Sequence, residues 1–178
     1  ASDRAKILHK AANLMREAND DLAYLEVRDV GKLFSEAVSG DVPSGTDAFD
    51  YFAACITTQN GDFNKWNTGI GYSVRVPLGV CAGIGAWNYP MQITCWKSAP
   101  ALAAGNAFIL KPSEETPFVA QKVAELLQAA GLPDGLFQII HGDRDIGAAI
   151  CAHPGIAKIS LTGGVETGRL IMAQSAHS

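Results

Sequence analysis

The sequence is poor in cysteine, in clustered positive charge and in long apolar runs. Its 178 residues contain four cysteines, at positions 55, 81, 95 and 151, and no C-x-x-C pair. Each cysteine lies in an apolar stretch, which favours buried thiols in a reducing compartment over disulfides or metal ligands. The net charge is −4 without clusters of lysine or arginine, which argues against nucleic-acid or anionic-membrane binding. No apolar stretch is long enough to span a bilayer. We therefore expect a cytoplasmic protein with neither nucleic-acid nor membrane partners.

The sequence does contain enough apolar residues to bury a core. Hydrophobic residues make up 48% and charged residues 18% of the chain, which is typical of a globular domain. In a first segment, residues 1–59, apolar side chains recur at helical spacing from Ile7 to Ala18, from Leu22 to Leu33 and from Phe49 to Cys55, so we expect three helices. The Pro, Ser and Gly residues between Val42 and Thr46 predict a loop before the third helix.

A second segment, residues 60–76, is polar and contains glycine, and its last part, Tyr72 to Val76, alternates like a strand. We expect a loop and hairpin-like excursion here. The third segment, residues 77–178, alternates short apolar runs with helical patterns. The runs are Val80–Ile84, Ala107–Leu110, Leu136–Ile140 and Ile156–Leu161, and the helical patterns are Met91–Ala104, Pro117–Ala130 and Asp145–Ala152.

This alternation of strands and helices implies parallel βαβ units with right-handed crossovers. Gly105 and Gly131 stand where left-handed helix ends need glycine, and Thr116 is expected to cap the helix that begins at Pro117. The predicted fold is therefore α/β, an open, doubly wound, Rossmann-like parallel sheet with flanking helices in one domain. In such sheets ligands bind at the carboxyl ends of the strands.

The most informative stretch, Leu78 to Trp96, reads LGVCAGIGAWNYPMQITCW. Its apolar start predicts a strand, the small residues from Gly83 to Ala86 predict a turn, and Pro90 suits the first turn of a helix while keeping Tyr89 out of helical geometry. Small residues let a backbone approach a ligand, and a helix start attracts negative charge. A dinucleotide cofactor would fit this strand-turn-helix elbow, although a plain strand-to-helix connection would have the same pattern.

Two further polar signals follow predicted strands. Lys111-Pro112-Ser113-Glu114 places a carboxylate and a cation where a nicotinamide-adenine dinucleotide needs partners for its adenosine ribose, and the carboxylate would repel a 2′-phosphate. A solvated Lys/Glu pair is the alternative. The second signal, Thr162 to Gly168, reads TGGVETG and opens a helix whose amides could face a pyrophosphate. It lacks the G-x-G-x-x-G spacing, and glycine-rich βα turns are common.

Several ordered blocks together closely resemble the aldehyde dehydrogenase superfamily, and they cover essentially the whole chain. These blocks are EVRDVGK at 26–32, AWNYP at 86–90, WKSAPALAAGN at 96–106, KPSE at 111–114, AGLPDGLF at 130–137 and ISLTGG at 159–164. The GIGAWNYP wording is most similar to the betaine aldehyde dehydrogenase branch. The resemblance implies an incomplete aldehyde dehydrogenase fold that binds NAD.

The resemblance also implies roles for individual residues. Asn88 matches the amide that helps to hold the oxyanion, and Lys97 matches a lysine with a proton-relay role. The cofactor contacts would come from the elbow, from the loop after the second strand and from the final helix start. They are Gly85, Ala86, Trp87, Asn88, Lys111, Pro112, Ser113, Glu114, Gly164, Val165, Glu166, Thr167 and Gly168. Asp29 and the backbone near Glu115 match a monovalent-cation site, for which potassium is the candidate, although an acidic residue on a helix is usually just solvated.

Substrate choice has its own argument. Tyr89 and Trp96 are seven residues apart, so on a helix they could face one side. In the betaine-aldehyde branch the matching aromatics form part of a box around a trimethylammonium group, which aromatic faces attract by about 2 kcal/mol when the cation is desolvated. Core packing of Trp96 is the alternative.

The chain ends at Ser178, ahead of the segment in which the family carries its general-base glutamate and its nucleophilic cysteine. We therefore expect this chain alone to be inactive, as part of an NAD-dependent enzyme that oxidises betaine aldehyde or a related aminoaldehyde in glycine betaine biosynthesis. The full-length protein would be a homo-oligomer. The alternative is a non-catalytic nucleotide-binding or assembly remnant.

Overall fold

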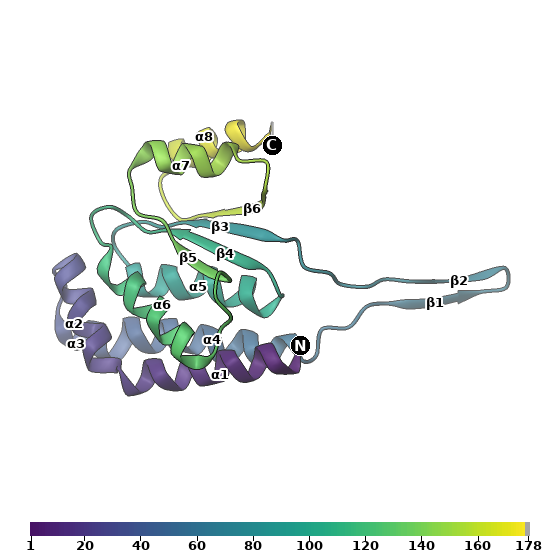
Figure 1. Cartoon of the computed structure of the whole chain (residues 1–178), viewed down its shortest axis with the longest axis horizontal. Helices are drawn as coiled ribbons and strands as arrows, with labels where there is room; N and C mark the ends of the chain where they lie inside the picture. The colour runs from purple at the N-terminus through teal and green to yellow at the C-terminus, as the bar shows by residue number, and fades with distance from the viewer. Residues whose placement is uncertain (177–178) are drawn as a thin grey trace.

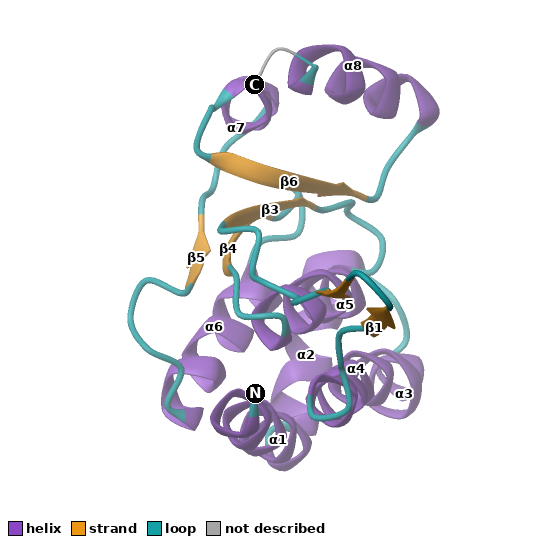
Figure 2. Ribbon diagram, turned by 90° about the vertical axis from the view of Figure 1, so that its right-hand side faces the viewer, coloured by secondary structure: helices purple, strands orange, loops and turns teal. Residues whose placement is uncertain are grey.

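The computed structural model describes residues 1–176 as an α/β fold in layers (Figure 1). Helices α7 and α8 cover one face of a parallel sheet, while α5 and α6 cover the other (Figure 2). Helices α1, α2 and α4 form a further layer behind α5 and α6. A two-stranded hairpin projects from this body.

The first helices lie close to where the periodicity predicts them, but the second ends at Val30 rather than Leu33 and the third begins earlier than expected. Helix α1 spans Ser2–Glu17, α2 spans Asn19–Val30, and a short α3, Phe34–Glu36, leads through a π-helix, η1, Ala37–Asp41, into α4, Val42–Ile56.

The predicted loop from Val42 to Thr46 is wrong, because these residues form the first turns of α4. Pro43 lies in the first turn, where its missing N–H is not needed. Gly45 lets α4 approach α5, since a Cβ there would lie 3.1 Å from both Cys95 Sγ and Met91 Cε. The composition of the segment therefore reflects a helix start and a close helix crossing.

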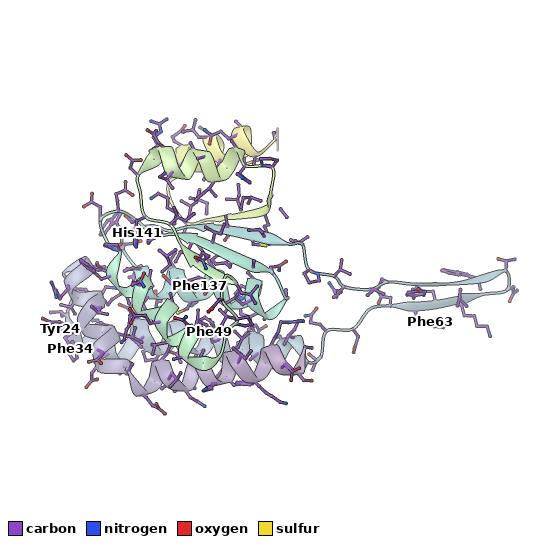
Figure 3. The ribbon with its side chains drawn as sticks, in the orientation of Figure 1. Tyr24, Phe34, Phe49, Phe63, Phe137 and His141 are labelled. Atoms are coloured by element: carbon purple, nitrogen blue, oxygen red, sulfur yellow. The ribbon has the colours of Figure 1, made fainter. Side chains whose placement is uncertain are left out.

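The second segment forms the expected hairpin, but its strands begin earlier than predicted. Strands β1, Phe63–Trp66, and β2, Gly69–Tyr72, pair antiparallel, with Phe63 opposite Tyr72. The strand predicted for Tyr72 to Val76 is wrong beyond Tyr72. Figure 3 shows Phe63 far out on the hairpin, in contrast to Phe49 and Phe137 within the body.

The main sheet contains β3, Val80–Ile84, β4, Ala107–Lys111, β5, Phe137–Ile139, and β6, Ile156–Leu161. Its strand order is β5-β4-β3-β6, and every neighbouring pair is parallel. The connecting helices are α5, Pro90–Ala103, α6, Phe118–Ala130, and α7, Arg144–Ala152, and α8, Val165–Ser175, follows β6. The doubly wound parallel sheet is thus confirmed.

The predicted cap of α6 is wrong in an instructive way. Thr116 is buried and its hydroxyl has no hydrogen-bond partner among the described residues. The first amides of α6 instead donate to the carboxylate of Asp29 in α2, from Phe118 N at 3.2 Å and from Val119 N at 3.0 Å. The helix start is therefore satisfied by a residue about ninety positions away, which no local pattern reveals.

The largest core cluster lies between the sheet and the first helices. Leu8 and Met15 of α1, Phe49 of α4 and Met91 of α5 are fully or almost fully buried within it. All four cysteines lie within the described residues, and none forms a disulfide. Among residues 1–176, no helix is both long and apolar enough to cross a membrane.

Candidate functional site

The three polar loops leave the sheet at one edge. The strands are parallel, so the segments after β3, β4 and β6 all start at the carboxyl ends of their strands, opposite the hairpin (Figure 1). Hydrogen bonds join the loops, because Gly85 N donates to Lys111 O at 2.9 Å and Thr162 N donates to Ile84 O at 3.1 Å. Strand β3 lies between β4 and β6, so the chain reverses its winding direction here, which is where open α/β sheets bind ligands.

The elbow after β3 has the predicted form. Tyr89, with φ −141° and ψ 60°, is not helical, and Pro90 is the first residue of α5. Gly85 and Ala86 are half-buried, while Trp87 is 59% exposed and Asn88 is also exposed. The elbow therefore presents an indole and an amide side chain to whatever lies outside the sheet edge.

Lys111 and Glu114 form an ion pair with a buried lysine, rather than two solvated side chains. The Lys111 side chain is 6% exposed, and its Nζ donates to Glu114 Oε2 at 3.0 Å and to the Pro112 carbonyl at 3.1 Å. A hydrogen bond from its own backbone amide and a second from Lys111 lower the pKa of Glu114. The carboxylate, which is half-exposed, is thus ionised at neutral pH and open on its outer side.

The start of α8 is open. Gly164 precedes the helix with extended backbone, φ −71° and ψ 155°, and no side chain of residues 1–176 is seen to cap the helix. Val165, Glu166 and Thr167 are exposed, and Glu166 pairs with Arg169 at 2.7 Å. Gly168, within the helix, is half-buried. First-turn amides of α8 are thus accessible at the sheet edge that carries the other two loops.

Lys97 lies on α5 and is 8% exposed. Its Nζ donates to Ser160 Oγ of β6 at 3.1 Å, and burial lowers the pKa of Lys97 to about 8. It lines a hollow of about 230 Å³ together with Cys81, Trp96 and Ser160. Asn88 lines a different, open hollow, so within this chain the two candidate catalytic side chains do not share one cavity.

Tyr89 and Trp96 are likewise separated. Tyr89 lines the hollow beside Asn88, whereas Trp96 lines the hollow beside Lys97. Because Tyr89 lies before the helix, helical spacing does not fix its direction. Trp96 is 52% exposed and donates from Nε1 to the Ser44 carbonyl at 3.3 Å, so core packing of Trp96 is wrong for this chain. Their joint role in an aromatic box stays a prediction.

At the candidate cation site, part of the hydrogen-bonding capacity of Asp29 is already used by protein groups. Asp29, whose pKa burial raises, accepts two backbone amides of α6. Glu115 is exposed, and its backbone N donates to Ser113 Oγ at 3.3 Å. Within residues 1–176, no three His, Cys, Asp or Glu residues are grouped to hold a metal ion. Potassium binding stays a prediction.

Sequence reasoning missed a buried charge cluster beneath the elbow, which consists of Glu26, Lys32 and Asp41. Glu26 is fully buried and accepts from Lys32 Nζ at 3.2 Å and from Met91 N at 3.0 Å, and Lys32 also bonds to Asp41. One signal could have revealed it. Glu26 lies on the same helical stripe as the buried residues Leu22 and Ala23, where an apolar residue is expected.

The model of the aldehyde dehydrogenase family matches residues 1–178. A betaine aldehyde dehydrogenase from Agrobacterium fabrum is 54% identical over 174 residues, which cover 97% of this chain and 35% of that protein. A gamma-glutamyl-gamma-aminobutyraldehyde dehydrogenase structure from Burkholderia cenocepacia superposes with a TM-score of 0.96 at 37% identity, over 99% of this chain and 36% of that one. A betaine aldehyde dehydrogenase structure from Staphylococcus aureus, in complex with NAD+, gives 0.95 at 34% identity, over 99% and 36%.

The chain thus spans about a third of the length of the relatives it matches. The family match extends over the whole chain, and three polar loops of this chain meet at the switch point of the sheet. The chain belongs to the aldehyde dehydrogenase family.

Proposed function

We propose that this chain is the cofactor-binding part of an NAD-dependent aldehyde dehydrogenase that oxidises betaine aldehyde or a related aminoaldehyde to the carboxylic acid. The observation that carries the proposal is the meeting of three polar loops at the switch point of one sheet. The similarity to two betaine aldehyde dehydrogenases supports the substrate class. The nucleophilic cysteine and the general-base glutamate would come from the rest of the enzyme.

The residues at the sheet edge fit NAD. The ionised Glu114 carboxylate can accept hydrogen bonds from ribose hydroxyls, the buried Lys111 ammonium holds that carboxylate in place, and a 2′-phosphate would be repelled. The open start of α8 can stabilise a pyrophosphate by about 0.3 to 1 kcal/mol beyond the individual hydrogen bonds. When bound, NAD supplies the hydride acceptor. Gly85, Ala86 and Trp87 would line its nicotinamide side.

Asn88 and Lys97 would carry the chemistry that this chain contributes. The exposed Asn88 amide can donate to the aldehyde oxygen as negative charge develops on it, and loss of such a donor typically costs about 2.7 to 4 kcal/mol of transition-state stabilisation. Lys97, with a pKa of about 8, is close to half-protonated at mildly alkaline pH. It can therefore accept and release a proton within the enzyme's interior.

The Tyr89 ring is 46% exposed although it contacts Lys32, so the part of the ring that Lys32 does not cover can meet a cationic substrate. Lys32 Nζ lies 4.2 Å from the ring centroid. A trimethylammonium group on an aromatic face would gain about 2 kcal/mol when desolvated. We further propose a cytoplasmic homo-oligomer that serves glycine betaine synthesis, with potassium bound near Asp29 and Glu115. The exposed Phe63, Trp66 and Tyr72 on the projecting hairpin support contact with a further protein surface.

A second candidate function is non-catalytic nucleotide binding. Burial raises the pKa of Cys81, Cys95 and Cys151, so these thiols do not supply a reactive thiolate. A protein that contained only the cofactor-binding loops of this chain would bind NAD without redox turnover. Measuring NADH formation with betaine aldehyde by the complete protein, together with NAD binding, separates the two functions.

The test of the cofactor role is Glu114→Ala in the complete enzyme. We expect the KM for NAD to rise at least tenfold while the KM for aldehyde stays within about twofold, because one charge-assisted hydrogen-bond acceptor contributes about 1.5 to 3 kcal/mol. Glu125→Ala, which removes an exposed carboxylate from α6 that pairs with Lys122 at 3.6 Å, is the matched control. Equal changes in both KM values would contradict the assignment.

A further inference from the structure

The charge cluster of Glu26, Lys32 and Asp41 joins three elements beneath the elbow. Lys32 Nζ lies 3.2 Å from Glu26 Oε1, is bonded to Asp41 Oδ2, and lies 4.2 Å from the centroid of the Tyr89 ring. The other oxygen of Glu26 accepts from Met91 N, the second residue of α5. One lysine thus connects α2 and η1 to the residues on either side of Pro90.

Local sequence explains how these groups meet. Gly31 ends α2 in the left-handed region, φ 79°, which glycine adopts without strain, and the following Lys32 can then turn back along the helix toward Glu26. The π-helix η1 then brings Asp41 to the same ammonium. Such π-turns occur frequently at functional sites.

The cluster is buried, with the Glu26, Asp41 and Lys32 side chains 0%, 9% and 12% exposed. Burial alone would lower the pKa of Lys32, but its bonds to Asp41 and Glu26 outweigh this effect and raise it, so the ammonium is retained. Buried ion pairs contribute little net stability compared with apolar packing, and their best-supported use is to specify one conformation. The conformation specified here is that of the elbow.

The elbow is fixed at both ends. At its start, Gly85 N donates to the Lys111 carbonyl. At its end, Glu26 holds Met91 N and Lys32 supports the Tyr89 ring. Asn88, between these two anchors, is exposed. Its direction therefore depends on the residue that follows it, and that residue lies against Lys32.

We propose that Lys32 is a positioning residue: anchored by Glu26 and Asp41, it holds Tyr89 and thereby aims the Asn88 amide at the reacting carbonyl. The inference rests on the proposed function of Asn88. Lys32 itself does not touch the reacting atoms. Small misplacements of a catalytic group cost up to about 100-fold in rate, so the main effect of losing Lys32 falls on turnover rather than on NAD binding.

The experiment compares Lys32→Met and Lys32→Arg in the complete enzyme. We expect Lys32→Met to lower kcat about 10- to 100-fold with the Kd for NAD within about twofold, and Lys32→Arg, which keeps a cation, to recover most of kcat. Arg28→Met is the matched control. It removes a cation from the last turn of α2, just before Lys32, that lies 6.0 Å from the Tyr24 ring and 5.9 Å from the Phe118 ring, and kcat should stay unchanged.

A double-mutant cycle separates this inference from the proposed function. If Lys32 acts through Asn88, Lys32→Met has no further effect on kcat in an Asn88→Ala background. Full additivity of the two losses, or an unchanged kcat in Lys32→Met while Asn88→Ala is impaired, overturns the role of Lys32 alone. An unchanged kcat in Asn88→Ala overturns the proposed oxyanion role. Should Lys32→Met fail to fold, Lys32→Met/Asp41→Asn removes one charge of each sign and is measured in the same way.

Discussion

The four helices that follow strands of the main sheet begin in two different ways. Helices α5, α6 and α7 each start against a carboxylate, from Glu26, Asp29 and Asp143 respectively. Helix α8 starts at Gly164 without a side-chain cap. A helix start attracts negative charge, and in the first three cases the protein supplies that charge itself. At α8 no such carboxylate hydrogen bond is found among the described residues, and we propose that a ligand anion takes this position.

The difference also separates two kinds of chemistry. Glu26 and Asp29 are three residues apart on α2, so one helix fixes the starts of both α5 and α6. The loops before these helices carry the side chains Asn88 and Glu114, whose proposed roles need a fixed direction. The loop before α8 offers backbone amides instead. The capped starts of α5 and α6 thus suit loops that act through side chains. The uncapped start of α8 suits an anion such as pyrophosphate.

The largest effect on turnover is expected from Asn88→Ala, in the loop before the capped helix α5. Removing an oxyanion donor should lower kcat about 100- to 1,000-fold, whereas the Kd for NAD should change less than about twofold, because the other cofactor contacts remain. Steady-state kinetics and NAD titration of the complete enzyme measure both. Asn13→Ala, on the exposed surface of α1, controls for losing an asparagine. A parallel loss of NAD affinity would mean that the capped elbow also serves the cofactor directly.

A smaller effect is expected from closing the open start with Gly164→Asp. A Cβ at Gly164 meets nothing within 4 Å and its φ is −71°, so the substitution is accommodated. The new carboxylate would cap α8 and repel a pyrophosphate, so we expect NAD affinity to fall about tenfold while thermal stability rises slightly. Gly164→Ala, which adds only the Cβ, should change affinity less than about threefold. Equal effects of the two variants would show that α8 does not face the cofactor.

Sequence patterns predicted the strands and loops at this sheet edge well, but not the tertiary contacts that support them. The bounds of β3 and β6 and the three loops follow from apolar runs that end at glycine or proline, which are local signals. The cap of α6 was missed, because Asp29 and Phe118 are distant in sequence. The start of α4 was missed as well, because Gly45 serves a contact with α5 that only the tertiary structure shows. Lys32 escaped notice for the same reason, since its partners come from three elements.

A loss of stability is expected from Asp29→Ala, which removes the carboxylate that caps α6. The two amides of α6 would lose their acceptor, and the free energy of unfolding should fall by about 0.5 to 2 kcal/mol. Asp29→Asn keeps one oxygen acceptor, so its free energy of unfolding should fall less. Chemical denaturation in sodium and in potassium salts measures both effects. If potassium stabilises the wild type but not Asp29→Ala, the cation proposal is supported, and an unchanged unfolding free energy would mean that Asp29 does not cap α6.

A last effect is expected in the pH dependence of stability that the cap of α5 contributes. Burial raises the pKa of Glu26 from its usual 4.5 to about 7, which Lys32 and the Met91 amide only partly oppose. Between these values the unfolded chain has lost a proton that the folded protein still holds, so the folding stability contributed by Glu26 is present below about pH 4.5 and is lost as pH rises through about 7.

The variant Glu26→Gln tests this pH dependence, because a glutamine side chain cannot ionise. The wild type should therefore lose stability relative to Glu26→Gln across this window and run parallel to it above, as measured by unfolding at a series of pH values. Glu166→Gln, at the exposed acidic residue in the first turn of the open helix α8, is the control. The same pH-dependent loss of the wild type relative to Glu166→Gln would remove the contrast between capped and open helix starts.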